Sequence, residues 1–117
     1  MSKTSRTLIL KFILTFLAMI ATLFYIDANP LGWVFVVALF GTVVNYLIGD
    51  LIILSFSNNL IASVGNGLMA AVIAFVFDLV TVVNITFTSL VFLVIIIAAV
   101  EYLFHQYLLA VEEVLPE

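Results

Sequence analysis

The chain has 117 residues, of which 67% are hydrophobic and only 9% are charged, and it contains no cysteine. A soluble domain carries about 25% charged residues, so this composition excludes a water-soluble globule and indicates a single domain that lies in a lipid bilayer. The lack of cysteine excludes disulfides and thiolate metal sites.

The ionisable side chains are distributed unevenly along the chain. All three basic residues lie within the first eleven positions, and the formal net charge is −4 because seven acidic residues are scattered over the rest. Basic residues beside a spanning helix tend to stay in the cytoplasm, whereas acidic residues contribute little to orientation. We therefore expect a cytoplasmic N-terminus, with the first apolar segment retained as a spanning helix rather than cleaved as a signal peptide.

Four apolar segments are each long enough to cross a hydrocarbon core of about 30 Å, which takes about 20 helical residues. Backbone groups in lipid must satisfy their own hydrogen bonds, and continuous apolar runs favour helices over a closed barrel. A short acidic tail follows the last of them. The predicted spans are residues 7–26, 31–54, 60–80 and 85–109, and the tail is 110–117.

Three short connections separate the spans. The first, DANPLG at 27–32, carries Pro30, whose fixed φ suits a first helical turn. The second is the polar sequence SFSNN at 55–59, and the third lies near TVVN at 81–84. Short connections make neighbouring helices antiparallel. The sequence therefore predicts an all-α polytopic membrane protein, an up-down-up-down four-helix bundle with both termini cytoplasmic.

Small residues recur at helical spacing in two of the spans. Hydrophobic burial cannot drive helices together in lipid, so close packing through small residues does so. Because residues three and four apart share one face of a helix, each stripe predicts a packing surface, inside the bundle or between two copies. A pore lining is the alternative. The second-span stripe is Ala38, Gly41, Asn45 and Gly49, and the third-span stripe is Ser63, Gly67, Ala71, Ala74 and Asp78.

Ionisable residues from three spans are predicted to reach one level near the cytoplasmic ends. A rise of about 1.5 Å per residue places Lys11 one turn inside the first span, Asp50 near the end of the second and Glu101 late in the fourth. His105 follows Glu101 by four residues on the same face, where the two would share a proton. Tyr46 precedes Asp50 by four and would donate its hydroxyl to it. We expect Lys11 to pair with Asp50 or Glu101.

Two interpretations of these residues stay open. An ionisable group inside a membrane is costly and by default marks function, here a proton or ion path. The structural alternative places Asp50 among wet headgroups and lets Lys11 snorkel to the same surface. Glu101 and His105 would then form a clasp between helices. One histidine with one or two carboxylates does not make a closed metal shell, so we expect no metal and no cofactor.

Three stretches carry a resemblance to a known family: KFILT at 11–15, NYLIGDLIIL at 45–54 and EYLFHQY at 101–107. From about Leu10 to Tyr107 the chain resembles the YndM-like family, small four-helix membrane proteins of unknown function from Bacillus-type bacteria. Two positions depart from the family pattern: Ser55 stands where a proline is usual, and Asn66 where an aspartate is usual. The second departure removes a possible charge from the third span. The resemblance implies a bacterial cytoplasmic-membrane protein and brings no known activity.

Three functions remain open on the sequence alone. A structural or accessory protein acting through helix–helix association is the leading expectation, because small-residue stripes are present and a soluble domain is not. The alternatives are a small oligomeric transporter or channel that uses the Asp/Glu/His cluster, and a holin-like lesion former. No phosphate loop, activated nucleophile or basic nucleic-acid patch occurs, so we expect no enzyme and no nucleic-acid partner. The expected partners are the lipid bilayer and a second copy or another membrane protein.

Overall fold

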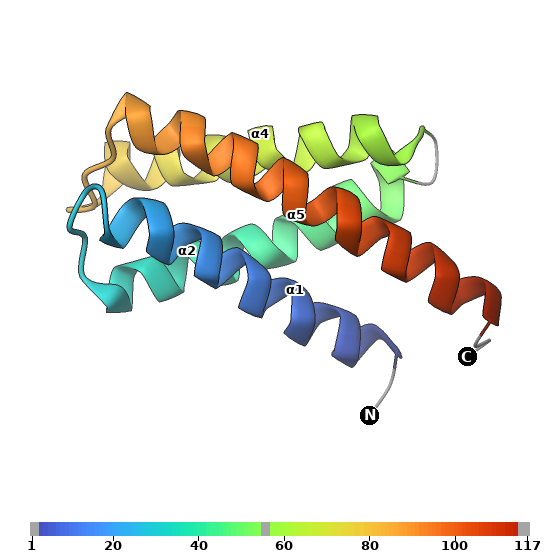
Figure 1. Ribbon diagram of the computed structural model, residues 1–117. Coiled ribbons are helices and arrows are strands. Elements are labelled where there is room, and N and C mark those ends of the chain that lie inside the picture. The colour runs from blue at the N-terminus through green and yellow to red at the C-terminus, as the bar shows by residue number, and fades with distance from the viewer. Residues whose placement is uncertain (1–2, 55–56, 115–117) are drawn as a thin grey trace.

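The structure, a computed structural model, describes residues 3–54 and 57–114, and the side chains of residues 5–54, 57–104 and 106. It consists of four helical rods packed side by side (Figure 1), and the described part of the chain contains no strand. The elements, in chain order, are α1 (Lys3–Met19), the π-helix η1 (Ile20–Phe24), α2 (Leu31–Val44), the π-helix η2 (Asn45–Ile53), α4 (Asn59–Val80) and α5 (Phe87–Val114).

Neighbouring rods run in opposite directions, so α1 begins and α5 ends at the same end of the bundle (Figure 1). We call this the terminal end, and we call the opposite end, with the connections at 25–30 and 81–86, the loop end. The bundle measures 43 × 28 × 21 Å, and its long axis matches the thickness of a bilayer with its headgroups, about 40–45 Å. The predicted all-α fold of four membrane-length helices is thus confirmed. The apolar spans are Ser5–Phe24, Leu31–Ile53, Asn59–Val80 and Phe87–Phe104.

The helix boundaries differ from the predicted ones at both ends of the chain and within the second span. α1 begins at Lys3 rather than at residue 7, and α5 continues to Val114 instead of ending at 109. The second span changes at Asn45 from an α-helix to a π-helix, whose hydrogen bonds join residues i and i+5. Apolar length identifies a span, but it does not show where a helix extends into polar sequence.

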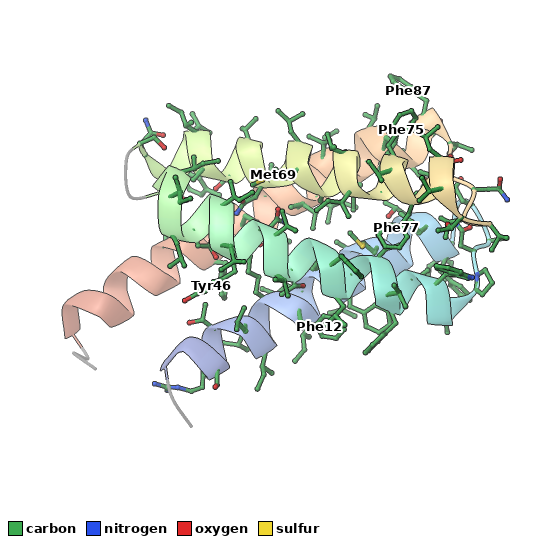
Figure 2. All side chains as sticks on the ribbon, turned by 180° about the vertical axis from the view of Figure 1, so that it is seen from behind. Phe12, Tyr46, Met69, Phe75, Phe77 and Phe87 are labelled. Atoms are coloured by element: carbon green, nitrogen blue, oxygen red, sulfur yellow. The ribbon has the colours of Figure 1, made fainter. Side chains whose placement is uncertain are left out.

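The exterior of the bundle is apolar and part of its interior is polar, the reverse of a soluble protein. Phe75 and Phe87, labelled in Figure 2, are 47% and 80% exposed, and Leu51 is 50% exposed. Lipid is the solvent that suits such a surface. Buried polar side chains come from every rod: Thr7, Lys11, Thr15 and Thr22 from the first, Thr42, Asn45 and Asp50 from the second, Ser63 and Asn66 from the third, and Ser89 and Glu101 from the fourth.

An apolar core fills the half of the bundle nearer the loop end. Ten side chains that are no more than 4% exposed form this core, and every rod contributes to it. Their close packing supplies dispersion attraction between helices that hydrophobic burial cannot supply in lipid. The members are Ala18, Met19, Leu23, Val34, Val37, Ala38, Ala70, Ala74, Leu93 and Ile97.

Asn29 joins the two connections at the loop end. Its side-chain amide donates to the carbonyl oxygens of Leu23 at 3.0 Å and Asn84 at 2.7 Å. Its Oδ1 accepts the backbone amide of Asn84 at 2.8 Å. Beside it, the carboxylate of Asp27 accepts the amide and the hydroxyl of Thr86, at 3.0 and 2.8 Å. The connection between the first two rods is thereby tied to the connection between the last two.

We expect Asn29→Ala to lower the free energy of unfolding by about 1–3 kcal/mol, because it removes the side-chain hydrogen bonds that join Asn29 to the main chain of Leu23 and Asn84. Thermal unfolding in detergent, followed by circular dichroism, measures the change. Asn84→Ala is the matched control, since within the described part of the chain the exposed Asn84 side chain bonds only to the nearby Val82 carbonyl, at 3.3 Å. Equal losses in the two variants would contradict the role given to the Asn29 side chain.

Candidate functional site

Four side chains, one from each rod, meet in the half of the bundle nearer the terminal end. Each is buried: the most exposed of them, Asp50, has only 7% of its surface accessible. The charged members therefore neither lie among headgroups nor snorkel to the surface, as the structural alternative required. We call these four residues the ionic cluster: Lys11 of α1, Asp50 of η2, Asn66 of α4 and Glu101 of α5.

Two donors in the ionic cluster each bridge both carboxylates. Lys11 Nζ lies 3.4 Å from Asp50 Oδ1 and 3.1 Å from Asp50 Oδ2, and it also binds Glu101 Oε2. Asn66 Nδ2 donates to Asp50 Oδ1 at 3.3 Å and to Glu101 Oε2 at 2.9 Å. The ring of Phe104 lies beside the ammonium group, with 5.4 Å from Nζ to the ring centroid. The cluster thus cross-links all four rods.

The formal charges of the ionic cluster do not balance. One ammonium group faces two carboxylates, so the cluster carries a net charge of −1 when all three groups are ionised. A buried net charge costs several kcal/mol, so a further positive charge in or beside the cluster, such as a proton, would stabilise it. Among the described side chains, no three His, Cys, Asp or Glu residues converge to hold a metal ion. The Lys11 ammonium itself occupies the space between the carboxylates.

The π-helix η2 explains how Gly49 and Asp50, adjacent in sequence, both face the interior. Bonds from residue i to i+5 widen the turn, so residues four and five apart line the same face. Asn45, Gly49 and Asp50 are accordingly all buried. Leu47 and Leu51, on the outer face, are 52% and 50% exposed. π-Helical segments are rare and frequently occur at functional sites.

Gly49 allows the second and third rods to approach at the ionic cluster. A Cβ atom at this position would lie only 1.7 Å from Oδ1 of Asn66. Any larger residue at position 49 would therefore push the Asn66 amide away from the carboxylates. The small-residue stripe of the second span thus has a specific role here, since it makes room for a polar side chain.

The structure shows some of the contacts predicted for the cluster residues and not others. Lys11 contacts both acidic partners instead of one of them, Asp50 or Glu101. Tyr46 is half-buried and makes no hydrogen bond within the described part of the chain, so the expected donation to Asp50 is not observed. His105 lies on α5, but its side chain is outside those that the structure describes, and its predicted role stays a prediction.

Sequence reasoning missed Asn66 as a member of the site. The sequence singled it out only as an asparagine where the family pattern has an aspartate. Because that change removes a charge, Asn66 was not expected to join the charged residues. A usable signal was nonetheless present, because an amide in the interior of an apolar span needs hydrogen-bond partners from another helix. In the structure those partners are the two carboxylates, Asp50 and Glu101.

The two small-residue stripes pack inside the bundle. Gly41 faces α1, where an added Cβ would lie 3.4 Å from Cε of Met19. Gly67 faces α5, where an added Cβ would lie 2.6 Å from the carbonyl oxygen of Val94. Both stripes are therefore occupied by contacts within the chain. Of the remaining members, Ala38, Asn45, Gly49, Ser63 and Ala74 are buried, and Ala71 and Asp78 are half-buried.

Comparison with known proteins supplies a family but no activity. Residues 2–115 match the family described as "Protein of unknown function (DUF2512)". Neither a curated protein nor a solved structure matches the chain. Because the match covers almost the whole sequence, with all four rods and the ionic cluster, the chain belongs to the DUF2512 family, whose function is unknown.

Proposed function

We propose that the protein moves protons across the bacterial cell membrane, with the ionic cluster as its proton-binding site and both termini in the cytoplasm. The observation that carries this proposal is the burial of one lysine against two carboxylates inside a bundle with an apolar exterior. The resemblance to the YndM-like family supports a bacterial membrane. The basic residues near the N-terminus support the orientation.

Proton binding would neutralise the ionic cluster without any change in its packing. A hydronium ion arriving from the terminal end gives its proton to the carboxylate of Asp50 or Glu101 and leaves as water. Lys11 stays bonded to the carboxylate that remains ionised, so no charge is left alone. Loss of the proton to water restores the starting state. The cluster thus alternates between a net charge of −1 and a net charge of zero.

Release on the other side of the membrane requires a second conformation. In the structure the apolar core separates the ionic cluster from the loop end. The π-helix η2 is the natural joint for such a change, since it carries Asp50 and π-helical segments frequently occur at functional sites. A return to α-helical bonding would turn Asp50 relative to Asn45. A second copy of the chain would help to complete the path, because four helices enclose little space.

Proton flux into liposomes tests the proposal directly. We expect purified protein to acidify vesicles that contain a pH-sensitive dye when a potassium gradient and valinomycin impose a voltage. Glu101→Gln and Asp50→Asn each remove one proton acceptor and should reduce the flux to that of protein-free vesicles. Asp27→Asn is the matched control, because it removes a carboxylate at the loop end, outside the cluster, and keeps an oxygen for Thr86. This control should retain the wild-type flux.

Three results would count against proton transport. The first is wild-type protein that gives no flux above the protein-free vesicles. The second is a flux that both cluster variants retain. The third is the escape of a large encapsulated dye together with the protons, which would indicate the holin-like lesion former instead.

An accessory role through helix–helix association, the leading expectation from the sequence, has less support. Its argument rested on the small-residue stripes, and these are occupied within the chain. Association would have to use the lipid-facing surface instead. There an apolar groove of about 440 Å³ lies between α4 and α5 and includes Ala98, Ala99 and Leu103. This groove is the first place to look for contact with a second membrane protein.

A further inference from the structure

Four buried polar atoms near the ionic cluster have no hydrogen-bond partner in the described part of the chain. They are both amide atoms of Asn45 and the hydroxyl oxygens of Thr15 and Thr42. The three side chains are at most 3% exposed. Thr15 and Thr42 stand about half-way along the spans Ser5–Phe24 and Leu31–Ile53, so these atoms lie near the middle of the bundle.

Thr15 and Asn45 each lie one turn from a member of the ionic cluster, and Thr42 lies one turn before Asn45. Thr15 is one turn beyond Lys11 on the buried face of α1, and Asn45 is one π-helical turn before Asp50. Thr15 reaches the second rod at Gly41, where an added Cβ would lie 3.9 Å from its Cγ2. Gly41 is in turn one helical turn from Asn45. The polar interior therefore continues from the ionic cluster to the edge of the apolar core.

The unpartnered threonine hydroxyls are not explained by a lack of acceptors. The Thr22 hydroxyl donates to the Ala18 carbonyl oxygen, one turn earlier in the same rod, at 3.1 Å. Thr15 and Thr42 stand in helices that offer the same kind of carbonyl, yet they make no such bond. A threonine among apolar groups satisfies its hydroxyl in this way. A hydroxyl that points away from this carbonyl oxygen is favoured when a polar molecule binds to the hydroxyl instead.

We infer that Asn45, Thr15 and Thr42 bind water in the centre of the bundle. Buried water typically takes two to four hydrogen bonds from polar groups that otherwise lack partners. The amide of Asn45 offers a donor and an acceptor, and each hydroxyl can act as either. None of the three side chains is charged, so water fits better than an ion. As a route for protons this water rests on the proposed function, and it extends the path from the ionic cluster to the apolar core.

Solid-state NMR in lipid bilayers tests the water directly. Magnetisation transferred from water to the side-chain amides is measured on protein labelled with ¹⁵N-asparagine, and the Asn45 signal is identified by its loss in Asn45→Leu. We expect rapid transfer to Asn45. Asn29 is the reference, because its buried amide donates to carbonyl oxygens of the protein. Transfer to Asn45 that is no faster than transfer to Asn29 would overturn the inference.

Thermal unfolding gives an independent test, because the two possibilities change the unfolding temperature in opposite directions. Valine has nearly the shape of threonine but no hydroxyl, so Thr15→Val and Thr42→Val lower the unfolding temperature if the hydroxyls bind water. The same variants raise it if the hydroxyls are dry and unpaired, and that result would contradict the inference. Thr22→Val is the control, since it removes a bond within the protein and should leave the Asn45 water signal unchanged.

The two proposals can fail separately. Rapid water transfer to Asn45 in a protein without proton flux would support the water site and refute the proton route. Proton flux in a protein whose Asn45 amide is dry would refute the water site and leave the proton-binding role of the ionic cluster intact.

Discussion

Replacing Lys11 by methionine is expected to destabilise the bundle more than any single replacement of its acidic partners. Lys11→Met removes the ammonium group that binds the buried carboxylates of Asp50 and Glu101, and losing one side of a buried ion pair costs about 3–5 kcal/mol. Glu101→Gln instead leaves one cation facing one anion. We therefore expect a clearly smaller loss from Glu101→Gln. Reversible unfolding in mixed detergent micelles measures both changes.

The charge imbalance also predicts how Lys11 and Glu101 act in combination. In the Glu101→Gln background, Lys11→Met removes the ammonium group from one carboxylate instead of two, so its effect should shrink. The double-mutant cycle should give a coupling energy of about 0.5–3 kcal/mol. Arg6→Met is the control, because it removes an exposed cation from the same helix. Additive effects, or a larger loss from Glu101→Gln than from Lys11→Met, would argue against the net negative charge.

Gly67→Ala is expected to separate α4 from α5 and to destabilise the bundle by about 1–3 kcal/mol, the usual effect of overpacking. The new Cβ would lie 2.6 Å from the carbonyl oxygen of Val94 and 3.4 Å from the backbone nitrogen of Ala98. Both atoms belong to the backbone of α5, so neither can move aside as the end of a flexible side chain could. The same unfolding measurement follows the loss.

Gly65→Ala supplies the matched control two residues away on the same helix. An added Cβ there would lie 3.7 Å from Cδ1 of Ile53, which is an ordinary van der Waals contact. Alanine is favoured over glycine inside a helix by about 1 kcal/mol, so this variant should be neutral or more stable than the wild type. Gly65→Ala and Gly67→Ala should thus shift stability in opposite directions. Similar losses in both would show that the approach of Gly67 to α5 is not what limits stability.

Much of the fold and part of the site could be predicted from the sequence. Apolar length identified the four spans, because lipid permits few alternatives to a helix. Rise per residue placed Lys11, Asp50 and Glu101 at one depth. Depth along a helix does not fix the direction in which a side chain points, so the pairing of Lys11 with both carboxylates required the structure. Asn66 was missed because it carries no charge.

The π-helix η2 could not be predicted, and it changes which residues of the second span lie one helical turn apart. The expected bond between Tyr46 and Asp50 assumed that residues four apart stack as they do in an α-helix. In η2 the bonds join residues five apart, so Asn45 is the residue one hydrogen-bonded turn from Asp50. Asn45 is buried and Tyr46 is only half-buried. The sequence NYLIGDLII contains no residue that requires this pattern of bonds.

The apolar core has an electrical consequence for a protein that carries charge. A dry layer insulates whereas water conducts, so a membrane voltage would drop mainly across the half of the bundle that contains Leu93 and Ile97. In the proposed transport, with water between the terminal end and the ionic cluster, a proton would reach Glu101 almost without doing electrical work. The work of moving one charge through 100 mV, about 2.3 kcal/mol, would be confined to the passage through the core. Proton binding should therefore be nearly independent of voltage, and release at the loop end should depend on it steeply.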